Sequence, residues 1–292
     1  MNHAVYPCVA CLSAATNRFG HRGAYTYYRC RDCGTLQLAP MPSTDTMREA
    51  YQRDYSDAGH CQADPDRRNM EAKPQFDAIC DALLSHAKPG LVLDYGAGWG
   101  GLSVRLRNRG ITVEATELSS SMATHCESQG IPVQRAELNN ISGNSVYDAI
   151  VLSSVFEHLL EHEGWARDAR RLLKPDGLVV TLQPTAAFAT FGGMVARFGL
   201  THKELPLLHQ VFWPPWHTVL FSLQGMRSLF ERTGFELLEV RPAPLQRQAG
   251  YVGLAQRVVS TANALATPFF GNKWPLHVGH IFVFRKRCDC VP

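Results

Sequence analysis

The sequence lacks the segments that membrane and secreted proteins need. It contains no run of eighteen apolar residues, and its first residues do not form the charged-then-apolar pattern of a secretory signal. Its net charge is only +3, which argues against a nucleic-acid partner. Internal repeats and low-complexity tracts are also absent. We therefore predict a soluble, cytoplasmic protein with no membrane partner, whose 292 residues form one full-sized core and a small appendage.

Four of the nine cysteines form a pattern. Cys8 and Cys11 make one C-x-x-C pair, and Cys30 and Cys33 make a second pair 18 residues further on. This spacing falls within the zinc-ribbon range, and four thiolates can complete a tetrahedron around Zn²⁺. Two redox pairs are the alternative, but neither precedes a thioredoxin-like strand and helix. We predict a zinc ribbon over residues 1–40 whose closed site is structural.

The composition divides the rest of the chain into two parts. Residues 41–88 predict a helical linker or cover, with one helix whose N-cap is Ser43 or Thr44 and another over about 71–87. The polar segment 56–69 between them predicts a linker or mobile cover. From 89 to 292, short apolar strands alternate with amphipathic helices, which is typical of a doubly wound α/β sheet. The predicted strands span 91–95, 111–116, 132–136, 148–153, 177–183, 235–241 and 279–286.

A glycine-rich loop, "LVLDYGAGWGG" (91–101), follows the first of these strands. It fits the G-x-G-x-x-G pattern of dinucleotide-binding units, and it also fits the D-x-G-x-G-x-G loop that binds S-adenosylmethionine. Glu117, about 20 residues beyond the first glycine, suits the ribose hydroxyls of either ligand. Asp94 distinguishes them, because a carboxylate there would repel a pyrophosphate but attract the ammonium and sulfonium of S-adenosylmethionine.

Four further motifs occur in a fixed order. They are "YDAIVLSSVFEHL" (147–159), "ARRLLKPDGLVVTLQPT" (169–185), "HTVLFSLQGMRSLFERTGFELLEV" (217–240) and "HIFVFRKR" (280–287). With the glycine loop, they make residues 71–286 resemble the class I S-adenosylmethionine-dependent methyltransferases. The resemblance implies a seven-stranded Rossmann-like sheet whose last strand is inserted antiparallel.

The resemblance also implies the cofactor-binding residues. Glu117 would bind the ribose and Leu118 would pack on the adenine, while Glu137 fits either the adenine edge or a solvated loop. Ser153 and Ser154, at the end of the fourth strand, would border the transferred methyl. The full set is Asp94, Gly96, Ala97, Gly98, Glu117, Leu118, Ala136, Glu137 and Ser153.

A histidine is the expected base, because its side chain titrates near neutral pH. His158 follows the fourth strand beside the expected methyl position, and Glu157 could orient it or hold a substrate hydroxyl. His217 is the competing candidate, because the resemblance implies that its segment folds back over the same cleft. His158 and His162 have the i,i+4 spacing of a helical metal site, but we favour a solvated position for His162.

The segment 186–216 lies where this family builds its substrate cover. It is rich in aromatic residues, which predicts an apolar pocket wall with a few polar groups. We expect Trp213 and Trp216 to line the pocket with His209, although the aromatic residues could instead only pack an inserted helix pair onto the core.

These features together predict a methyltransferase that uses S-adenosylmethionine and acts on a small molecule. The N-terminal zinc module makes the chain resemble bacterial enzymes of sugar, polysaccharide and natural-product pathways. Two alternatives are a zinc-ribbon RNA base methyltransferase and a methyltransferase-like adaptor without catalysis. The ribbon could also bind a protein partner, and the chain could form a homo-oligomer.

Overall fold

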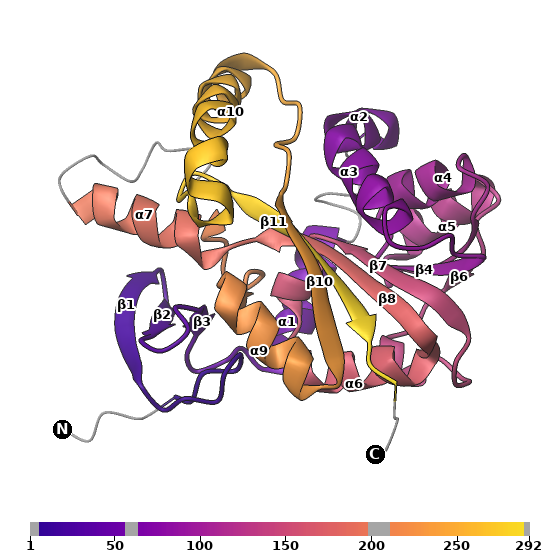
Figure 1. Cartoon of the computed structure of the whole chain (residues 1–292), viewed down its shortest axis with the longest axis horizontal. Helices are drawn as coiled ribbons and strands as arrows, with labels where there is room; N and C mark the ends of the chain where they lie inside the picture. The colour runs from indigo at the N-terminus through magenta and orange to yellow at the C-terminus, as the bar shows by residue number, and fades with distance from the viewer. Residues whose placement is uncertain (1–5, 56–63, 198–210, 289–292) are drawn as a thin grey trace.

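The computed structural model describes residues 6–55, 64–197 and 211–288, which form two β-sheets (Figure 1). The larger sheet has the strand order β10-β11-β8-β7-β4-β5-β6. Its strands are β4 (Leu91–Tyr95), β5 (Thr112–Thr116), β6 (Val133–Gln134), β7 (Tyr147–Ser153), β8 (Leu173–Pro184), β10 (Phe235–Pro242) and β11 (Gly279–Lys286). The five neighbouring strands β8, β7, β4, β5 and β6 pair in parallel, whereas β11 pairs antiparallel with β8 and β10. The predicted seven-stranded α/β fold is confirmed.

Helices cover both faces of this sheet. Leu93 and Ile150 pack in one hydrophobic cluster with α6 (His162–Leu172) and α9 (Leu223–Arg232). Val92 and Val151, their neighbours in the chain, pack in a second cluster with α3 (Lys73–Leu84) and α4 (Gly101–Arg107). Successive side chains of a strand point to opposite faces, so an uninterrupted apolar strand fits a sheet buried on both sides. A further helix, α5 (Ser120–Ser128), follows β5.

The smaller sheet joins the N-terminal residues to a segment from much later in the chain. β1 (Thr16–Arg22), β2 (Tyr25–Cys30) and β3 (Leu36–Leu38) form an antiparallel meander, and β3 pairs with β9 (Val219–Leu220). Leu36 lies opposite Leu220, and both are fully buried. The sequence did not predict this attachment. The proposed domain bounds of 1–40, 41–88 and 89–292 stay a prediction.

Helices α1 (Thr44–Tyr55), α2 (Pro65–Glu71) and α3 lie between β3 and β4 in the described part of the chain. Ser43 caps the start of α1, as predicted, because its hydroxyl accepts a hydrogen bond from the Thr46 amide at 3.1 Å. α2 occupies part of the segment predicted as a linker or mobile cover, where no separate helix was expected; residues 56–63 lie outside the described residues, and the role of the segment stays a prediction. The missed signal is Asp64, whose carboxylate caps the helix ahead of a proline.

The other long helices are α7 (Ala186–Arg197) and α10 (Gly250–Phe270), which stand near each other at one end of the molecule (Figure 1). α10 was not predicted, and of its residues only Gly253 and Gln256 are buried. Within the described ranges, no helix is long and apolar enough to cross a membrane. Single 3-10 turns span Leu138–Asn140, Phe156–His158 and Gly271–Lys273.

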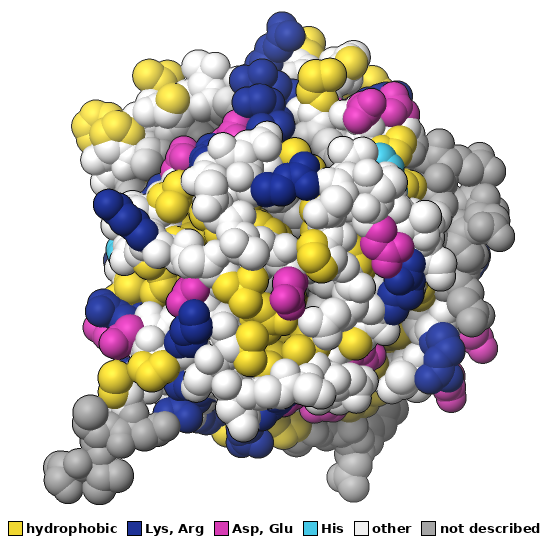
Figure 2. All heavy atoms as spheres, turned by 90° about the vertical axis from the view of Figure 1, so that its right-hand side faces the viewer, with side chains coloured by type: hydrophobic (Ala, Val, Ile, Leu, Met, Phe, Trp, Pro, Cys, Tyr) yellow, Lys and Arg dark blue, Asp and Glu magenta, His cyan; other side chains and the backbone are white. Residues whose placement is uncertain are grey.

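Basic and acidic side chains are interspersed on the face that carries α2 to α5 (Figure 2). Asp77 on α3 exemplifies the mixture, since its carboxylate contacts Lys73 at 2.8 Å and both Arg105 and Arg109 at 3.4 Å. Hydrogen bonds from Lys73 and Arg109 and the charge of Arg105 outweigh burial and lower the pKa of Asp77. This face therefore carries no extended field of one sign.

Candidate functional site

The glycine loop between β4 and α4 is tightly packed. Gly96 and Gly98 have φ values of +70° and +56°, which residues with a Cβ rarely adopt. A Cβ on Gly96 would also come within 2.8 Å of a Val155 methyl group. The loop therefore lies directly against the residues that follow β7, at the carboxyl end of the parallel strands.

Glu117 lies at the end of β5 and is hydrogen-bonded to this loop. One carboxylate oxygen accepts from the Gly98 amide at 2.8 Å, and the other accepts from the Ser119 amide at 2.8 Å and from the Tyr51 hydroxyl at 2.9 Å. Glu117 is only 7% exposed. The structure thus joins two predicted cofactor residues, Gly98 and Glu117, and adds Tyr51, which sequence reasoning missed.

Asp94 lies deeper, beneath the loop. It is almost completely buried, and its carboxylate accepts a 2.6 Å hydrogen bond from the Ser103 hydroxyl in α4. Burial raises the pKa of Asp94 to about 7, although the bond from Ser103 lowers it. A positive charge beside this carboxylate would favour its ionised form.

The remaining predicted cofactor residues follow successive strands at the same edge. Leu118 is half-exposed after β5, Ala136 and Glu137 follow β6, and Ser153 ends β7. In open α/β sheets, ligands bind outside the carboxyl ends of the strands. The structure places the predicted set at that edge, and the contact of each residue with a cofactor stays a prediction.

The turn after β7 brings together three ligand-type side chains. Glu157, His158 and His217 each offer one atom, and these atoms lie within 4.8 Å of one another. We call these three residues the acceptor cluster. Glu157 is 1% exposed, and neither carboxylate oxygen has a hydrogen-bond partner among the described residues. Burial raises the pKa of Glu157 to about 8.

Burial disfavours the charged form of both histidines in the acceptor cluster. The Nδ1 atom of His217 lies 2.6 Å from the Val211 carbonyl oxygen, and because a carbonyl only accepts, Nδ1 carries the proton and Nε2 carries the lone pair. Burial lowers the pKa of His217 to about 4. Burial, and then the charge of His217, also lowers the pKa of His158 well below its ordinary value. The Nε2 atom of His158 is buried without a partner among the described residues.

Two tryptophans flank the acceptor cluster. The Trp216 ring lies 5.9 Å from the His158 ring, and the Trp213 ring lies 6.1 Å from the His217 ring. The Trp216 indole donates a 2.8 Å hydrogen bond to Asp54 on α1. His209, the third residue predicted to contact substrate, lies outside the described residues.

Helix α1 therefore reaches both parts of the site, since Tyr51 binds Glu117 and Asp54 binds Trp216. Tyr51 and Asp54 are one turn apart on the same side of α1. That i,i+3 spacing was visible in the sequence, but nothing in it indicated what the helix covers.

His162, by contrast, belongs to the core. It is 3% exposed and packs edge-on against Phe156 and Phe221, with ring centroids 5.1 and 5.0 Å away. The predicted solvated position was wrong, because α6 turns His162 inward. Among the described residues, the candidate metal group at this edge pairs His158 with His217 instead.

The four patterned cysteines form a second cluster, in the N-terminal module. The Sγ atoms of Cys8 and Cys33 are 3.6 Å apart, as are those of Cys11 and Cys30, and all four lie within 4.8 Å. A zinc–sulfur distance of 2.3 Å gives tetrahedron edges of about 3.8 Å, so the thiols fit Zn²⁺. Their shared hydrogen bond raises the pKa of Cys8 and lowers that of Cys33 to about 5.

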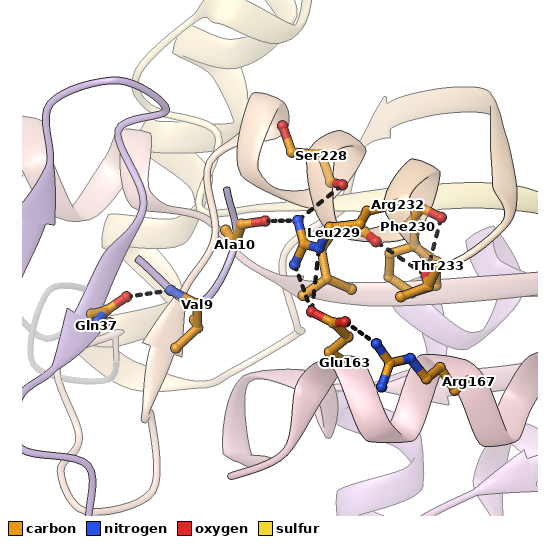
Figure 3. Close-up of polar contacts among 10 residues, drawn as sticks. All are labelled: Val9, Ala10, Gln37, Glu163, Arg167, Ser228, Leu229, Phe230, Arg232 and Thr233. Atoms are coloured by element: carbon orange, nitrogen blue, oxygen red, sulfur yellow. Dashed lines mark hydrogen bonds and ion pairs between the residues drawn. The ribbon is translucent and has the colours of Figure 1, made fainter. Parts of the chain in front are cut away.

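The cysteine module is fastened to α9 and α6 (Figure 3). The Arg232 guanidinium donates to the Ala10 carbonyl at 2.8 Å and pairs with Glu163 on α6 at 3.0 Å. On the other side, the Gln37 carboxamide accepts from the Val9 amide at 2.9 Å. The first C-x-x-C turn is thus held between β3 and the helices of the larger sheet.

Residues 67–240 match the model of a family described as a methyltransferase domain. This match covers more than half of the chain, so the protein belongs to that family, within the class I S-adenosylmethionine-dependent methyltransferases. The resemblance drawn from the sequence motifs is confirmed. The family also supports S-adenosylmethionine as the methyl donor.

Two known proteins are similar to this chain in sequence. The chain is 27% identical over 197 residues to malonyl-[acyl-carrier protein] O-methyltransferase of Geobacter sulfurreducens, which is 61% of this chain and 68% of that one. It is 30% identical over 124 residues to cyclopropane-fatty-acyl-phospholipid synthase of Escherichia coli (strain K12), which is 39% of this chain and 31% of that enzyme. The chain thus spans about a third of the synthase.

A solved structure shows the same fold. It is 1,6-didemethyltoxoflavin-N1-methyltransferase of Burkholderia thailandensis, with a TM-score of 0.55 and 14% identity over 91% of this chain and 97% of that one. That crystal structure contains 1,6-didemethyltoxoflavin and S-adenosylhomocysteine.

Proposed function

We propose that the protein transfers the methyl group of S-adenosylmethionine to a small-molecule acceptor, such as a sugar, a polysaccharide precursor or a natural-product intermediate. The observation that carries this proposal is the acceptor cluster. Two buried polar side chains, Glu157 and His217, and the partly buried His158 lie beside Trp213 and Trp216, at the strand edge that carries the predicted cofactor residues. Aromatic walls with a few convergent polar groups are typical of small-ligand pockets.

The polarity of the cluster favours an acceptor with a hydroxyl or another ionisable group. Both relatives named above act on acyl compounds by their names. An acyl chain alone would leave the Glu157 carboxylate without a partner, and a buried polar group without a partner costs about 1–3 kcal/mol. A hydroxyl-bearing acceptor would supply hydrogen bonds to Glu157 and His158.

In the proposed reaction, the acceptor nucleophile attacks the sulfonium methyl in line. The new bond to carbon forms as the carbon–sulfur bond breaks, and the electron pair stays on sulfur. Glu117 would hold the ribose and Asp94 the ammonium, so the methyl is positioned near the end of β7. The acceptor proton leaves at the acceptor cluster, where His158 is our first candidate for the base and His217 the second.

The test combines binding with transfer. The purified protein is titrated with S-adenosylhomocysteine by calorimetry, and radiolabelled S-adenosylmethionine is then offered with panels of sugars and aromatic metabolites. We expect Trp216→Ala to raise the acceptor KM at least tenfold while S-adenosylhomocysteine affinity stays within about threefold, because the variant loses the pocket wall and the bond to Asp54 but keeps the bonds of Glu117. Trp274→Ala, which alters a tryptophan beside α10, is the matched control. Equal loss of both affinities in Trp216→Ala would contradict the pocket assignment.

We also propose one structural zinc ion in the cysteine cluster. The fit of the four thiols to a tetrahedron supports this proposal, as does the absence of an open ligand position in a four-thiolate site. The role of the zinc would be to hold the two C-x-x-C turns together and so keep β3 paired with β9.

A further inference from the structure

The acceptor cluster has the composition of a metal site. It combines one carboxylate with two imidazoles, whereas Mg²⁺ and Ca²⁺ prefer oxygen ligands alone. Two histidines and one glutamate are a known ligand set of catalytic zinc, and two histidines with one carboxylate also bind iron. Three protein ligands leave at least one coordination position open.

The orientation of His217 matches that of a metal ligand. Its Nδ1–H donates to the Val211 carbonyl at 2.6 Å, so its Nε2 lone pair is free of that bond and fixed in direction. Metal-binding histidines usually donate their other ring nitrogen in this way, to a carbonyl or a carboxylate. The Tyr27 hydroxyl, on β2 of the smaller, N-terminal sheet, donates to the His217 carbonyl at 2.9 Å and so fixes the backbone of His217.

Glu157 supplies the strongest sign that a ligand is needed. Both its oxygens are buried without a hydrogen bond from any described residue, and so is the Nε2 atom of His158. The backbone carbonyl of Glu157 accepts from the Thr218 amide at 2.9 Å and from the Thr218 hydroxyl at 3.0 Å. These bonds hold the turn that carries Glu157 in place. A carboxyl group buried in this way ionises only when a positive charge lies beside it. The sulfonium of the cofactor could supply a charge, but it cannot bind the histidine lone pairs.

We propose that Glu157, His158 and His217 bind a divalent transition-metal ion of the zinc class, and that the open position takes an oxygen of the acceptor. Binding would draw the three ligand atoms from within 4.8 Å to spacings of about 3.4 Å, which small side-chain rotations can achieve. The role of the ion rests on the proposed function. With the ion bound, the acceptor hydroxyl loses its proton to solvent as it binds the metal, and the imidazoles serve as ligands in place of a base.

The experiment counts metal per chain in the full-length protein, dialysed against Zn²⁺ and then against buffer. Wild type should hold two zinc ions, one in the cysteine cluster and one in the acceptor cluster. Glu157→Gln and His217→Gln should each hold one. His162→Gln changes a buried histidine of α6 outside the cluster and should keep two. Calorimetry with S-adenosylhomocysteine reports that each variant is folded.

Wild type with a single zinc, or a second zinc that survives in Glu157→Gln and His217→Gln, would overturn the proposal. Full methyl transfer by protein with one zinc would leave the proposed function intact and return the base role to His158. A protein that binds two zinc ions but no S-adenosylhomocysteine would contradict the proposed function while the metal site stands.

Discussion

The cofactor and acceptor halves of the site differ in how their buried acids are satisfied. Glu117 accepts three hydrogen bonds from the protein, and Asp94 accepts one from Ser103. Glu157, equally buried, accepts none from any described side chain or amide. A buried polar group without a partner is costly. The acids of the predicted cofactor half are therefore satisfied by the protein itself, whereas we propose that Glu157 is satisfied by what binds beside it.

The two halves also differ in how far their residues can be predicted from the sequence. Most of the predicted cofactor half lies within one stretch, from Asp94 to Ser119, and the spacing of its glycines and acids predicts one loop, one strand and one ligand. The acceptor half combines a turn after β7 with the segment before β9 and with helix α1. The resemblance placed the His217 segment over the same cleft as Glu157 and His158, but nothing in the sequence indicated that the three side chains form one cluster.

Elements set by tertiary contact were the hardest to predict. Tyr51 and Asp54 look like ordinary surface residues of an amphipathic helix, and their partners are 66 and 162 residues away. The pairing of β3 with β9 depends on two residues of each strand, too few for a periodic signal. The seven-stranded sheet, by contrast, follows from long apolar strands whose alternation with helices is visible throughout.

The largest expected effect tests whether the N-terminal module serves the acceptor half alone. Cys30→Ser should lose about one zinc per chain and unfold the module, because a structural zinc contributes on the order of 10 kcal/mol to such folds. Since β3 pairs with β9 just beyond His217, acceptor affinity should fall sharply while S-adenosylhomocysteine affinity changes less than about threefold. Metal analysis, thermal unfolding and calorimetry measure these outcomes.

Cys288→Ser is the matched control for that experiment, because Cys288 is exposed and lies outside the cysteine cluster. An unchanged zinc content in Cys30→Ser would show that the ligand set is wrong. A collapse of S-adenosylhomocysteine affinity would show that the module supports both halves.

The next effect tests the cofactor half. Glu117→Ala should weaken S-adenosylhomocysteine about 100-fold or more, because hydrogen bonds to a charged group contribute roughly 1.5–3 kcal/mol each and the ribose offers two hydroxyls. Calorimetry provides the measurement. Glu137→Ala, which removes an exposed acid after β6, should cost less than tenfold. Comparable losses in the two variants would refute the ribose assignment.

A pH series sharpens the contrast further. The pKa of Asp94 is raised to about 7 by burial, and the cofactor ammonium favours the ionised carboxylate. S-adenosylhomocysteine should therefore bind more weakly as pH falls below 7, by up to about tenfold per unit. The free energy of unfolding without ligand should change in the opposite sense, because the folded pKa of Asp94 lies above its unfolded pKa of about 4. The contribution of Asp94 to this free energy is fully present below pH about 4 and is lost as pH rises through about 7.

Two variants check the assignment of that pH dependence. Asp94→Asn should remove it and weaken binding at pH 8. Ser103→Ala should shift it to higher pH, because the hydrogen bond from Ser103 lowers the pKa of Asp94. A slope that persists unchanged in Asp94→Asn would assign it to another group.

The smallest expected effect tests how the N-terminal sheet reaches the acceptor cluster. The buried Tyr27 hydroxyl donates to the His217 carbonyl at 2.9 Å, and its ring packs on Phe212 at 5.1 Å. Tyr27→Phe keeps the ring and removes one neutral hydrogen bond, which contributes about 0.5–1.5 kcal/mol. The acceptor KM should rise about 2- to 10-fold, with S-adenosylhomocysteine affinity unchanged. Tyr28→Phe is the matched control, because neighbouring residues of β2 face opposite sides of the sheet. The two variants must differ if the N-terminal sheet positions His217 through this bond; an equal KM in both would mean that the sheet supports the acceptor half only through its backbone pairing with β9.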